Sequence, residues 1–271
     1  MPGTITSRKN ELVGEFLRLS SSSSFRREQG KIPLEGARLC CDAAASGLKV
    51  LSLFYTEEAA EKYGAYLQEV RASASAEYVV SASVALRLSE TKSPQGVFCV
   101  CAMPENDGAL PDTSDGVSFV MLERIQDPAN LGAVLRTAEA VGIGGVILSG
   151  DCCDVYSPKA LRAGMGAVFR LPVYRRGEAS ETILRLNEAG FHTLAAVPDR
   201  AAAPVTGIDF TVPSVAVIGN EGSGLTEAAQ RACTTRATIP MAGRAESLNA
   251  AASATILMWE MMRGRKGAAS R

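Results

Sequence analysis

The sequence predicts an α/β protein built from two domains. Runs rich in Val, Ile, Leu and Phe alternate along the chain with segments of helical periodicity, and this alternation is typical of α/β folds. A length of 271 residues leaves room for two domains of ordinary size. Residues 104–116 hold four acidic residues, two prolines and several turn formers, so they predict an exposed linker. We therefore expect domains at residues 1–103 and 117–271.

The first domain is expected to be a small α/β domain that binds the substrate. Its helices are expected at residues 8–19, 35–45, 57–71 and 83–89, and its strands at 50–55, 77–81 and 96–103. A serine run at 20–24 and a basic cluster follow the first helix, with no element assigned to them.

The second domain is expected to contain a mostly parallel sheet covered on both faces. Its strands are expected at residues 118–125, 144–150, 192–197, 214–220 and 237–241, and its helices at 133–142, 158–164, 181–190, 226–233 and 247–265. Ligands of such sheets bind beyond the carboxyl ends of the strands, so we expect the chemistry in the loops that follow them.

Composition excludes several classes of function. The 28 Lys and Arg nearly cancel the 29 Asp and Glu, which excludes a strongly basic nucleic-acid wrapper but leaves room for a local basic patch. The single histidine, His192, excludes a histidine triad, a two-histidine zinc site and a two-histidine acid–base pair. Since His192 begins an expected strand, we interpret it as structural. Aromatic residues make up only 6%, which disfavours recognition by stacked rings.

The cysteines and the apolar runs bear on the compartment. Seven cysteines without a Cys-x-x-Cys spacing predict neither a disulfide framework nor a zinc ribbon, so buried thiols and no metal are expected. The polar N-terminus lacks the pattern of a signal peptide, and no apolar run approaches the length of a membrane span. We expect a cytoplasmic protein that makes no contact with membranes.

Two strand-to-helix loops carry the first functional signals. In the loop after 118–125, Asn130 lies at the turn and Arg136 follows within two helical turns, so both can reach the loop mouth. In the loop after 214–220, three glycines allow a close backbone approach to a polar or anionic group, with Glu221 in the middle. Each loop alone also fits an ordinary turn, and Glu221 equally fits a helix-dipole partner.

A third loop, at residues 239–249, leads into the final helix. Ser247 and Asn249 are candidates for capping this helix. The small residues at 250–254 form a face suited to close helix contact, either within the core or across a subunit interface. The sequence contains no G-x-G-x-x-G motif, which disfavours an enzyme that binds a dinucleotide.

Taken together, the three loops resemble a known family. The stretches NLGAVLRTA, VIGNEGSGL and IPMAGRAESLNAAASA resemble the three signature motifs of the SpoU (TrmH-type) RNA ribose 2′-O-methyltransferases of the SPOUT class. SRKNELV, FRREQGKIPLEGARL and SPQGVFCV resemble the substrate-binding extension of ribosomal-RNA members. The resemblance implies a trefoil knot in the second domain, S-adenosylmethionine as methyl donor with S-adenosylhomocysteine as product, and a homodimer whose active sites draw on both subunits.

The resemblance also assigns roles to residues. It implies that Arg136 is the central catalytic residue, assisted by Asn130, Glu221, Ser247 and Asn249. A free guanidinium is a poor base at neutral pH, so Arg136 either has a perturbed pKa or positions a phosphate and stabilises charge. For the cofactor, the resemblance implies the positions Gly219, Asn220, Gly222, Ile239, Met241 and Leu248. A weaker candidate loop runs from Leu194 through Ala195 to Ala196.

RNA is the expected partner, with ribosomal RNA favoured over transfer RNA because of the sizeable first domain. Candidate RNA-binding residues are the basic side chains Arg26, Arg27, Lys31, Lys159 and Arg162. Gly14 and Gly164 depart from the family pattern, which often has Lys and Ser there, and put RNA affinity in doubt. A transfer-RNA methyltransferase and a non-catalytic RNA-binding or ribosome-assembly protein stay as alternatives.

Overall fold

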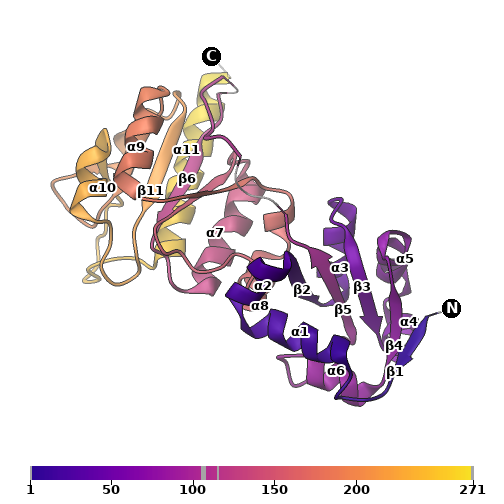
Figure 1. Ribbon diagram of the computed structural model, residues 1–271. Helices are drawn as coiled ribbons and strands as arrows, with labels where there is room; N and C mark the ends of the chain where they lie inside the picture. The colour runs from indigo at the N-terminus through magenta and orange to yellow at the C-terminus, as the bar shows by residue number, and fades with distance from the viewer. Residues whose placement is uncertain (1, 105–107, 115, 270–271) are drawn as a thin grey trace. The chain divides into compact units, whose positions relative to one another are not determined.

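The computed structural model describes residues 2–104, 108–114 and 116–269, and it divides the chain into two units (Figure 1). The first unit comprises Met1–Glu105 together with Tyr156–Phe169, and the second comprises Asn106–Val155 and Arg170–Arg271. The segment 156–169, which sequence reasoning placed in the second domain, thus clusters with the first unit. Of the predicted linker, 105–107 and 115 lie outside the described residues.

The first unit is built on a mixed five-stranded sheet. The strands, in spatial order, are β1 (Gly3–Ile5), β4 (Glu77–Val80), β3 (Val50–Tyr55), β5 (Val97–Ala102) and β2 (Lys31–Glu35). β1, β4 and β3 run parallel, whereas β5 is antiparallel to both of its neighbours. The helices are α1 (Glu11–Ser21), α2 (Ser23–Gln29), α3 (Ala37–Ala45), α4 (Glu57–Lys62), α5 (Gly64–Ser73), α6 (Ala82–Leu88) and α8 (Pro158–Gly164).

Apolar side chains of α1 and α6 cover one face of this sheet. Phe16 of α1 meets Phe98 of β5 edge to face, with ring centroids 5.7 Å apart, and Phe54 of β3 lies in the same cluster. Burying such rings contributes roughly 1.5–3 kcal/mol each, so these aromatic side chains anchor the helices to the sheet.

Three elements of the first unit escaped sequence reasoning. β2 contains Pro33, which argues against a central strand, but β2 lies at the sheet edge where a missing N–H is tolerated. α2 begins in the serine run because the Ser22 side chain accepts a hydrogen bond from Phe25 N and caps the helix. β1 is only three residues long. The helix expected over 57–71 is two helices, α4 and α5, separated at Tyr63.

The second unit is built on a parallel seven-stranded sheet, which confirms the predicted class. The spatial order is β10 (Ala203–Pro204), β12 (Thr235–Thr238), β9 (His192–Ala196), β11 (Ser214–Ile218), β6 (Phe119–Glu123), β7 (Val146–Ser149) and β8 (Val173–Arg176). All described pairings between these strands are parallel. β8 and the two-residue β10 were not predicted.

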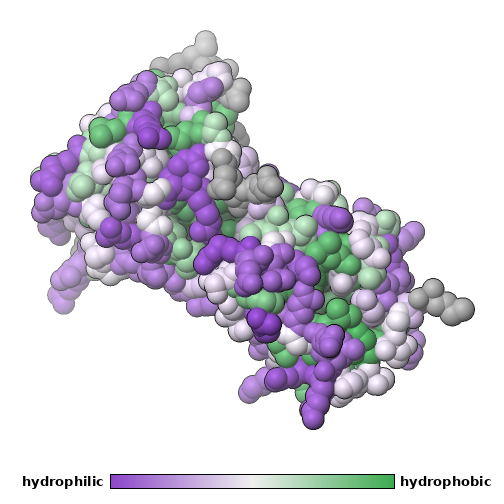
Figure 2. Space-filling model, viewed as in Figure 1, coloured by the Kyte–Doolittle hydropathy of each residue, from purple (hydrophilic) through white to green (hydrophobic). Residues whose placement is uncertain are grey.

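Helices cover both faces of the parallel sheet. They are α7 (Pro128–Val141), α9 (Ala179–Glu188), α10 (Glu227–Ala232) and α11 (Ala250–Ala269). α9 and α10 lie on one side of the sheet and α7 and α11 on the other (Figure 1). Hydrophilic residues predominate over the region of α9 and α10 in Figure 2, as expected for helices whose apolar stripes face the sheet.

All seven cysteines are free thiols. Cys40, Cys99 and Cys101 are buried as predicted, whereas the other four are half-buried. Burial raises the pKa of Cys99 and Cys153, the latter to about 12, so these thiols stay protonated at neutral pH.

Candidate functional site

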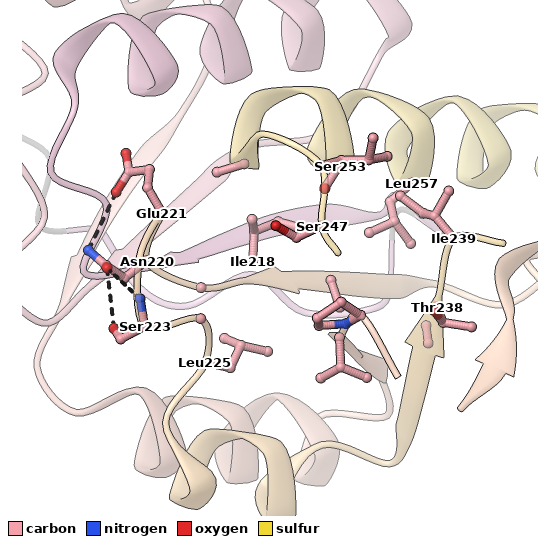
Figure 3. Close-up of a pocket in the computed structure, with 18 of the residues that line it drawn as sticks. Ile218, Asn220, Glu221, Ser223, Leu225, Thr238, Ile239, Ser247, Ser253 and Leu257 are labelled. Carbon is pink, nitrogen blue, oxygen red and sulfur yellow. Dashed lines mark hydrogen bonds between the residues drawn. The ribbon is translucent and has the colours of Figure 1, made fainter. Parts of the chain in front are cut away.

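A cavity of about 300 Å³ lies at the carboxyl ends of three neighbouring strands, β9, β11 and β12 (Figure 3). Its walls come from the segments 196–198, 218–225 and 237–241, and from residues of 247–257 at the start of α11. This is the edge of a parallel sheet at which ligands bind, and the volume is at the lower end of the range for small-molecule sites.

The turn after β11 shapes one wall of the cavity and requires glycine. A Cβ on Gly219 would lie 2.2 Å from both Gly224 C and Leu225 N, which no real side chain can tolerate. Asn220 closes the turn, because its Oδ1 accepts hydrogen bonds from Gly222 N at 2.9 Å and from Ser223 N at 3.1 Å. The wall is therefore backbone held in one shape.

The lining combines apolar and neutral polar side chains. Ile218, Leu225 and Leu257 surround the cavity, with the Ser247 hydroxyl among them (Figure 3). Glu221 is the one charged residue of the lining within the described part of the chain, and no Lys or Arg contributes to it. Such a site suits a neutral or cationic ligand and disfavours a polyphosphate.

Three polar side chains form a continuous hydrogen-bonded series at the rim. Asn249 Nδ2 donates to Asn130 Oδ1 at 3.0 Å, and Asn130 Nδ2 donates to Glu221 Oε1 at 3.0 Å. The Glu221 carboxylate also accepts from Asp127 N at 3.0 Å and from Gln126 N at 3.1 Å, where α7 begins. The three predicted residues from three separate loops are thus brought together.

These contacts set the charge state of Glu221. Burial alone would raise its pKa, but the hydrogen bonds from Asn130 and from nearby backbone N–H groups outweigh burial and hold the pKa below its ordinary value. Glu221 is therefore ionised at neutral pH and accepts hydrogen bonds only, which fixes which way the Asn130 amide points.

Asn249 also caps the final helix, as predicted. Its Oδ1 accepts from Ala251 N at 2.9 Å and from Ala252 N at 3.2 Å. Ser247, the other capping candidate, instead lines the cavity.

Arg136 lies on α7, outside the cavity lining. It is exposed and makes no hydrogen bond or ion pair with any residue that the structure describes. Its guanidinium is consequently available to a ligand that approaches from solvent.

Most of the predicted cofactor positions border the cavity: Gly219, Asn220, Gly222, Ile239, Met241 and Leu248. Leu194 and Ala195 do not line it, because both are fully buried inside β9. Ala196, the last residue of that candidate loop, does line the cavity, as do Val197 and Pro198. Ser253 and Leu257, one helical turn apart on α11, also line it and were not predicted.

The predicted RNA-binding residues differ in how far they are exposed to solvent. Arg26 is 3% exposed and donates to the carbonyls of Leu19 and Ser20 at the end of α1, so its assignment to RNA binding is wrong. Lys31 pairs with Glu15 at 2.6 Å.

The remaining three candidates are at least partly accessible. Arg162 pairs with Glu90 at 2.7 Å and is half-buried, whereas Arg27 and Lys159 are exposed. Gly14 is exposed on α1 with open space around it, and Gly164 is buried at the end of α8.

His192 has the structural position predicted for it. Its Nε2 lies 2.8 Å from Thr235 Oγ1 across the β9–β12 pair, away from the cavity lining. The described ranges contain no cluster of three or more His, Cys, Asp and Glu side chains arranged for a metal ion. Nor is any helix in them long and apolar enough to cross a membrane.

Comparison with known proteins identifies the family. Residues 118–259, just over half of the chain, match the model of the SpoU rRNA Methylase family. The chain belongs to the SpoU family. Its first part, residues 10–99, matches a second model, the MRM3-like substrate binding domain. The SpoU match spans the segment 156–169, although that segment clusters with the first unit.

Relatives of known sequence or structure match along nearly the whole chain. An uncharacterized tRNA/rRNA methyltransferase of Synechocystis is 32% identical over 96% of this chain and 93% of the relative. A 23S rRNA (uridine(2479)-2′-O)-methyltransferase of Streptomyces viridochromogenes is 32% identical over 96% and 92%. The crystal structure of an AdoMet-bound rRNA methyltransferase from Sinorhizobium meliloti superimposes with a TM-score of 0.84, at 30% identity and coverage of 96% and 97%.

Proposed function

We propose that this SpoU-family methyltransferase transfers a methyl group from S-adenosylmethionine to a ribose 2′-hydroxyl of ribosomal RNA. One observation carries the proposal. A cavity lined by no Lys or Arg of the described chain has the hydrogen-bonded side chains of Asn249, Asn130 and Glu221 at its rim. Ribosomal RNA is favoured because the Streptomyces relative acts on 23S rRNA and the first part of the chain matches a substrate-binding model.

The cavity residues fit S-adenosylmethionine, which supplies an electrophilic methyl group on a positively charged sulfur. The volume of about 300 Å³ suits a ligand of this size class, and the lining holds no cation that would repel the sulfonium. Backbone at Gly219 approaches the cavity without a side chain, and Ile218, Leu225 and Leu257 offer apolar contact to a planar ring.

The rim residues position the acceptor. The ionised Glu221 fixes the Asn130 amide, and the amide in turn orients Asn249, so the groups facing the substrate are preorganised at no cost during the reaction. The Ser247 hydroxyl lies on the same wall and can hydrogen-bond a ribose oxygen or the cofactor.

The 2′-hydroxyl must lose its proton during transfer, and Arg136 is the proposed residue at this step. Two accounts of its role stand side by side. In one, the RNA phosphate and neighbouring groups perturb the guanidinium until it accepts the proton; in the other, Arg136 holds the phosphate and stabilises the developing charge. Both need the planar guanidinium.

The proposed working form is a homodimer in the cytoplasm, with a knotted second unit. Support for the dimer is the exposed face of α11, where Ala252, Thr255 and the 52%-exposed Trp259 follow one another at helical spacing. A partner subunit on this side of the sheet would also approach Arg136 on the neighbouring α7. The knot is proposed from the family membership.

A transfer assay tests the function. Purified protein and S-adenosylmethionine are incubated with unmodified ribosomal RNA or transfer RNA, and 2′-O-methyl nucleotides are mapped by mass spectrometry. We expect one methylated ribose in ribosomal RNA. Methylation of transfer RNA alone would show that transfer RNA is the substrate instead of ribosomal RNA. Methylation of neither RNA would favour the non-catalytic RNA-binding alternative.

A further inference from the structure

Arg124, the residue directly after β6, has an unusual backbone conformation. Its φ is +54°, in the left-handed region. Among the described residues, Met165 is the one other non-glycine residue with a positive φ. A side chain with a Cβ is disfavoured there and glycine is not, so such positions often serve a function. Arg124 thus holds a conformation that a glycine would adopt without strain.

Three hydrogen bonds hold Arg124 in this conformation. Its N–H donates to Ser149 O at 3.1 Å, and its carbonyl accepts from Asn220 Nδ2 at 2.8 Å and from Gln126 Nε2 at 3.3 Å. All three use the main chain of Arg124, so none of them requires an arginine side chain.

The Arg124 side chain follows a defined path over the end of β7. A Cβ built on Gly150, whose φ is +61°, would lie 2.9 Å from Arg124 Cγ and 3.4 Å from Nε. The absence of a side chain at Gly150 therefore makes room for the arginine stem. Arg124 is exposed, and its guanidinium makes no hydrogen bond or ion pair within residues 2–104, 108–114 and 116–269.

The position of Arg124 relates it to the candidate site. Its carbonyl contacts Asn220, which shapes the cavity wall, and two residues later Gln126 N donates to Glu221. The stem nevertheless points to Gly150 at β7, whereas the cavity lies beyond β11 on the other side of β6. The sheet edge therefore has the cavity on one side of β6 and an unpaired cation on the other.

The neighbouring charges are mixed. Arg176 of β8 stands in register with Ser149, and its guanidinium donates to the carbonyls of Arg175 and Gly108. Arg175 lies 3.7 Å from Asp154, and Asp151 is an exposed acid in the loop after β7. Arg124 is the cation of this group whose guanidinium has no partner among the described residues.

We infer that Arg124 binds a phosphodiester group of the RNA strand that presents the target ribose. The inference rests on the proposed function. A ribose at the cavity mouth is flanked by phosphates, so the strand must cross the sheet edge, and on the β7 side it meets the Arg124 guanidinium. The planar fork of five donors matches phosphate oxygens, and the stem packed over Gly150 limits the freedom lost on binding.

The test distinguishes the effect of the Arg124 backbone conformation from the effect of its positive charge. Arg124→Gly and Arg124→Asn both accept a positive φ and remove the charge, while Arg124→Lys keeps the charge and the strain. Arg231→Gln, which removes an exposed arginine that pairs with Glu227 on α10, is the control for loss of one positive charge. The probe is large-subunit ribosomal RNA transcribed in vitro.

We expect Arg124→Gly and Arg124→Asn to weaken RNA binding about tenfold and to lower the slope of log affinity against log salt by about one. The KM for RNA rises while the affinity for S-adenosylmethionine is unchanged, and the thermal midpoint is equal or higher because strain is relieved. Arg124→Lys retains most of the binding, and Arg231→Gln behaves like the wild type.

RNA affinity and salt slope equal to the wild type in both Arg124→Gly and Arg124→Asn would overturn the inference. So would a fall in cofactor affinity with RNA binding intact, because that indicates a structural role toward Asn220. Wild-type protein that binds RNA but transfers no methyl group refutes the proposed function instead, and the binding comparison still decides for or against Arg124.

Discussion

The cavity and the exposed rim beside it are built in opposite ways. The cavity wall is backbone and apolar side chain, shaped by Gly219 and closed by hydrogen bonds of Asn220 within its own turn. On the rim, Asn130 and Glu221 are hydrogen-bonded to groups from other loops, and Arg136 is exposed with no partner in the described chain. The contrast indicates that the cavity wall is complete before any ligand binds, whereas the Arg136 guanidinium is left open to solvent.

Arg136→Ala should have the largest effect on the rim. We expect turnover to fall by about 10²–10⁴-fold, because the variant loses either the proton acceptor or the charge stabiliser. S-adenosylmethionine affinity and the thermal midpoint should not change, since Arg136 is exposed and lies outside the cavity lining. Single-turnover rates, calorimetric titration and thermal unfolding check the three quantities. Near-normal turnover in Arg136→Lys would contradict both accounts of its role.

Gly219→Ala should have the largest effect on the cavity. The new methyl group would overlap Gly224 C and Leu225 N, so the turn must move. We expect cofactor affinity to fall at least about tenfold and the protein to lose roughly 1–3 kcal/mol of stability. Gly177→Ala is the control, because Gly177 lies outside the cavity lining and nothing lies within 4 Å of the added Cβ. Equal cofactor affinities in the two variants would show that the wall is not preformed as described.

Asn249 connects the two regions and allows its two roles to be separated. Asn249→Ala removes both the helix cap and the donor to Asn130, so we expect about 1 kcal/mol of lost stability together with reduced turnover. Asn249→Asp keeps an acceptor for the cap but places a carboxylate against Asn130 Oδ1, so turnover should fall while stability is retained. Chemical denaturation and initial rates give the two readouts. If Asn249→Asp is fully active, the series Asn249–Asn130–Glu221 does not matter for catalysis.

His192 should have the smallest effect, since it belongs to neither region. We expect His192→Gln to keep kcat within about twofold, as the reaction uses no histidine. Burial lowers the pKa of His192, so the folded state binds its proton less readily than the unfolded state. Wild-type stability should therefore be complete above about pH 6.5 and decline as the pH falls below it, and His192→Gln should lack this component. Denaturation at pH 5 and 8 measures it; a large loss of kcat would reopen histidine chemistry.

Regular patterns made much of the fold predictable. Four of the strands of the parallel sheet were expected close to their observed bounds, because buried parallel strands are short apolar runs bounded by turn formers. The fifth, β12, spans Thr235–Thr238 and overlaps the strand expected at 237–241 by only two residues. β2 was missed because Pro33 is acceptable only at an edge, and the position of a strand within a sheet depends on long-range pairing. The break between α4 and α5 was missed, although Gly64, which begins α5, is visible in the sequence at that point.

The candidate site was predictable where the backbone conformation requires a particular residue type. It was less predictable where a residue's role depends on whether its side chain is buried. Gly219 is required by a close backbone approach, and that requirement shows in the sequence. Arg26 is a basic residue of the type that contacts RNA, but its guanidinium donates hydrogen bonds to the carbonyls of Leu19 and Ser20 at the end of α1. Leu194 and Ala195 lie a residue or two too early in β9, because only the end of the strand reaches the cavity.

The sequence by itself determined the class of the fold, the family and the residues that meet at the candidate site. Hydrophobic periodicity suffices for the fold class, since it depends on residues near one another in the chain. The family and its site residues follow from the resemblance of the motifs in three loops. Tertiary structure alone decided that Asn249, Asn130 and Glu221 form one hydrogen-bonded series, and that Arg124 lies over Gly150 with its charge unpaired in the described chain. These contacts join loops up to 119 residues apart, and only the parallel pairing of the strands brings those loops to one edge of the sheet.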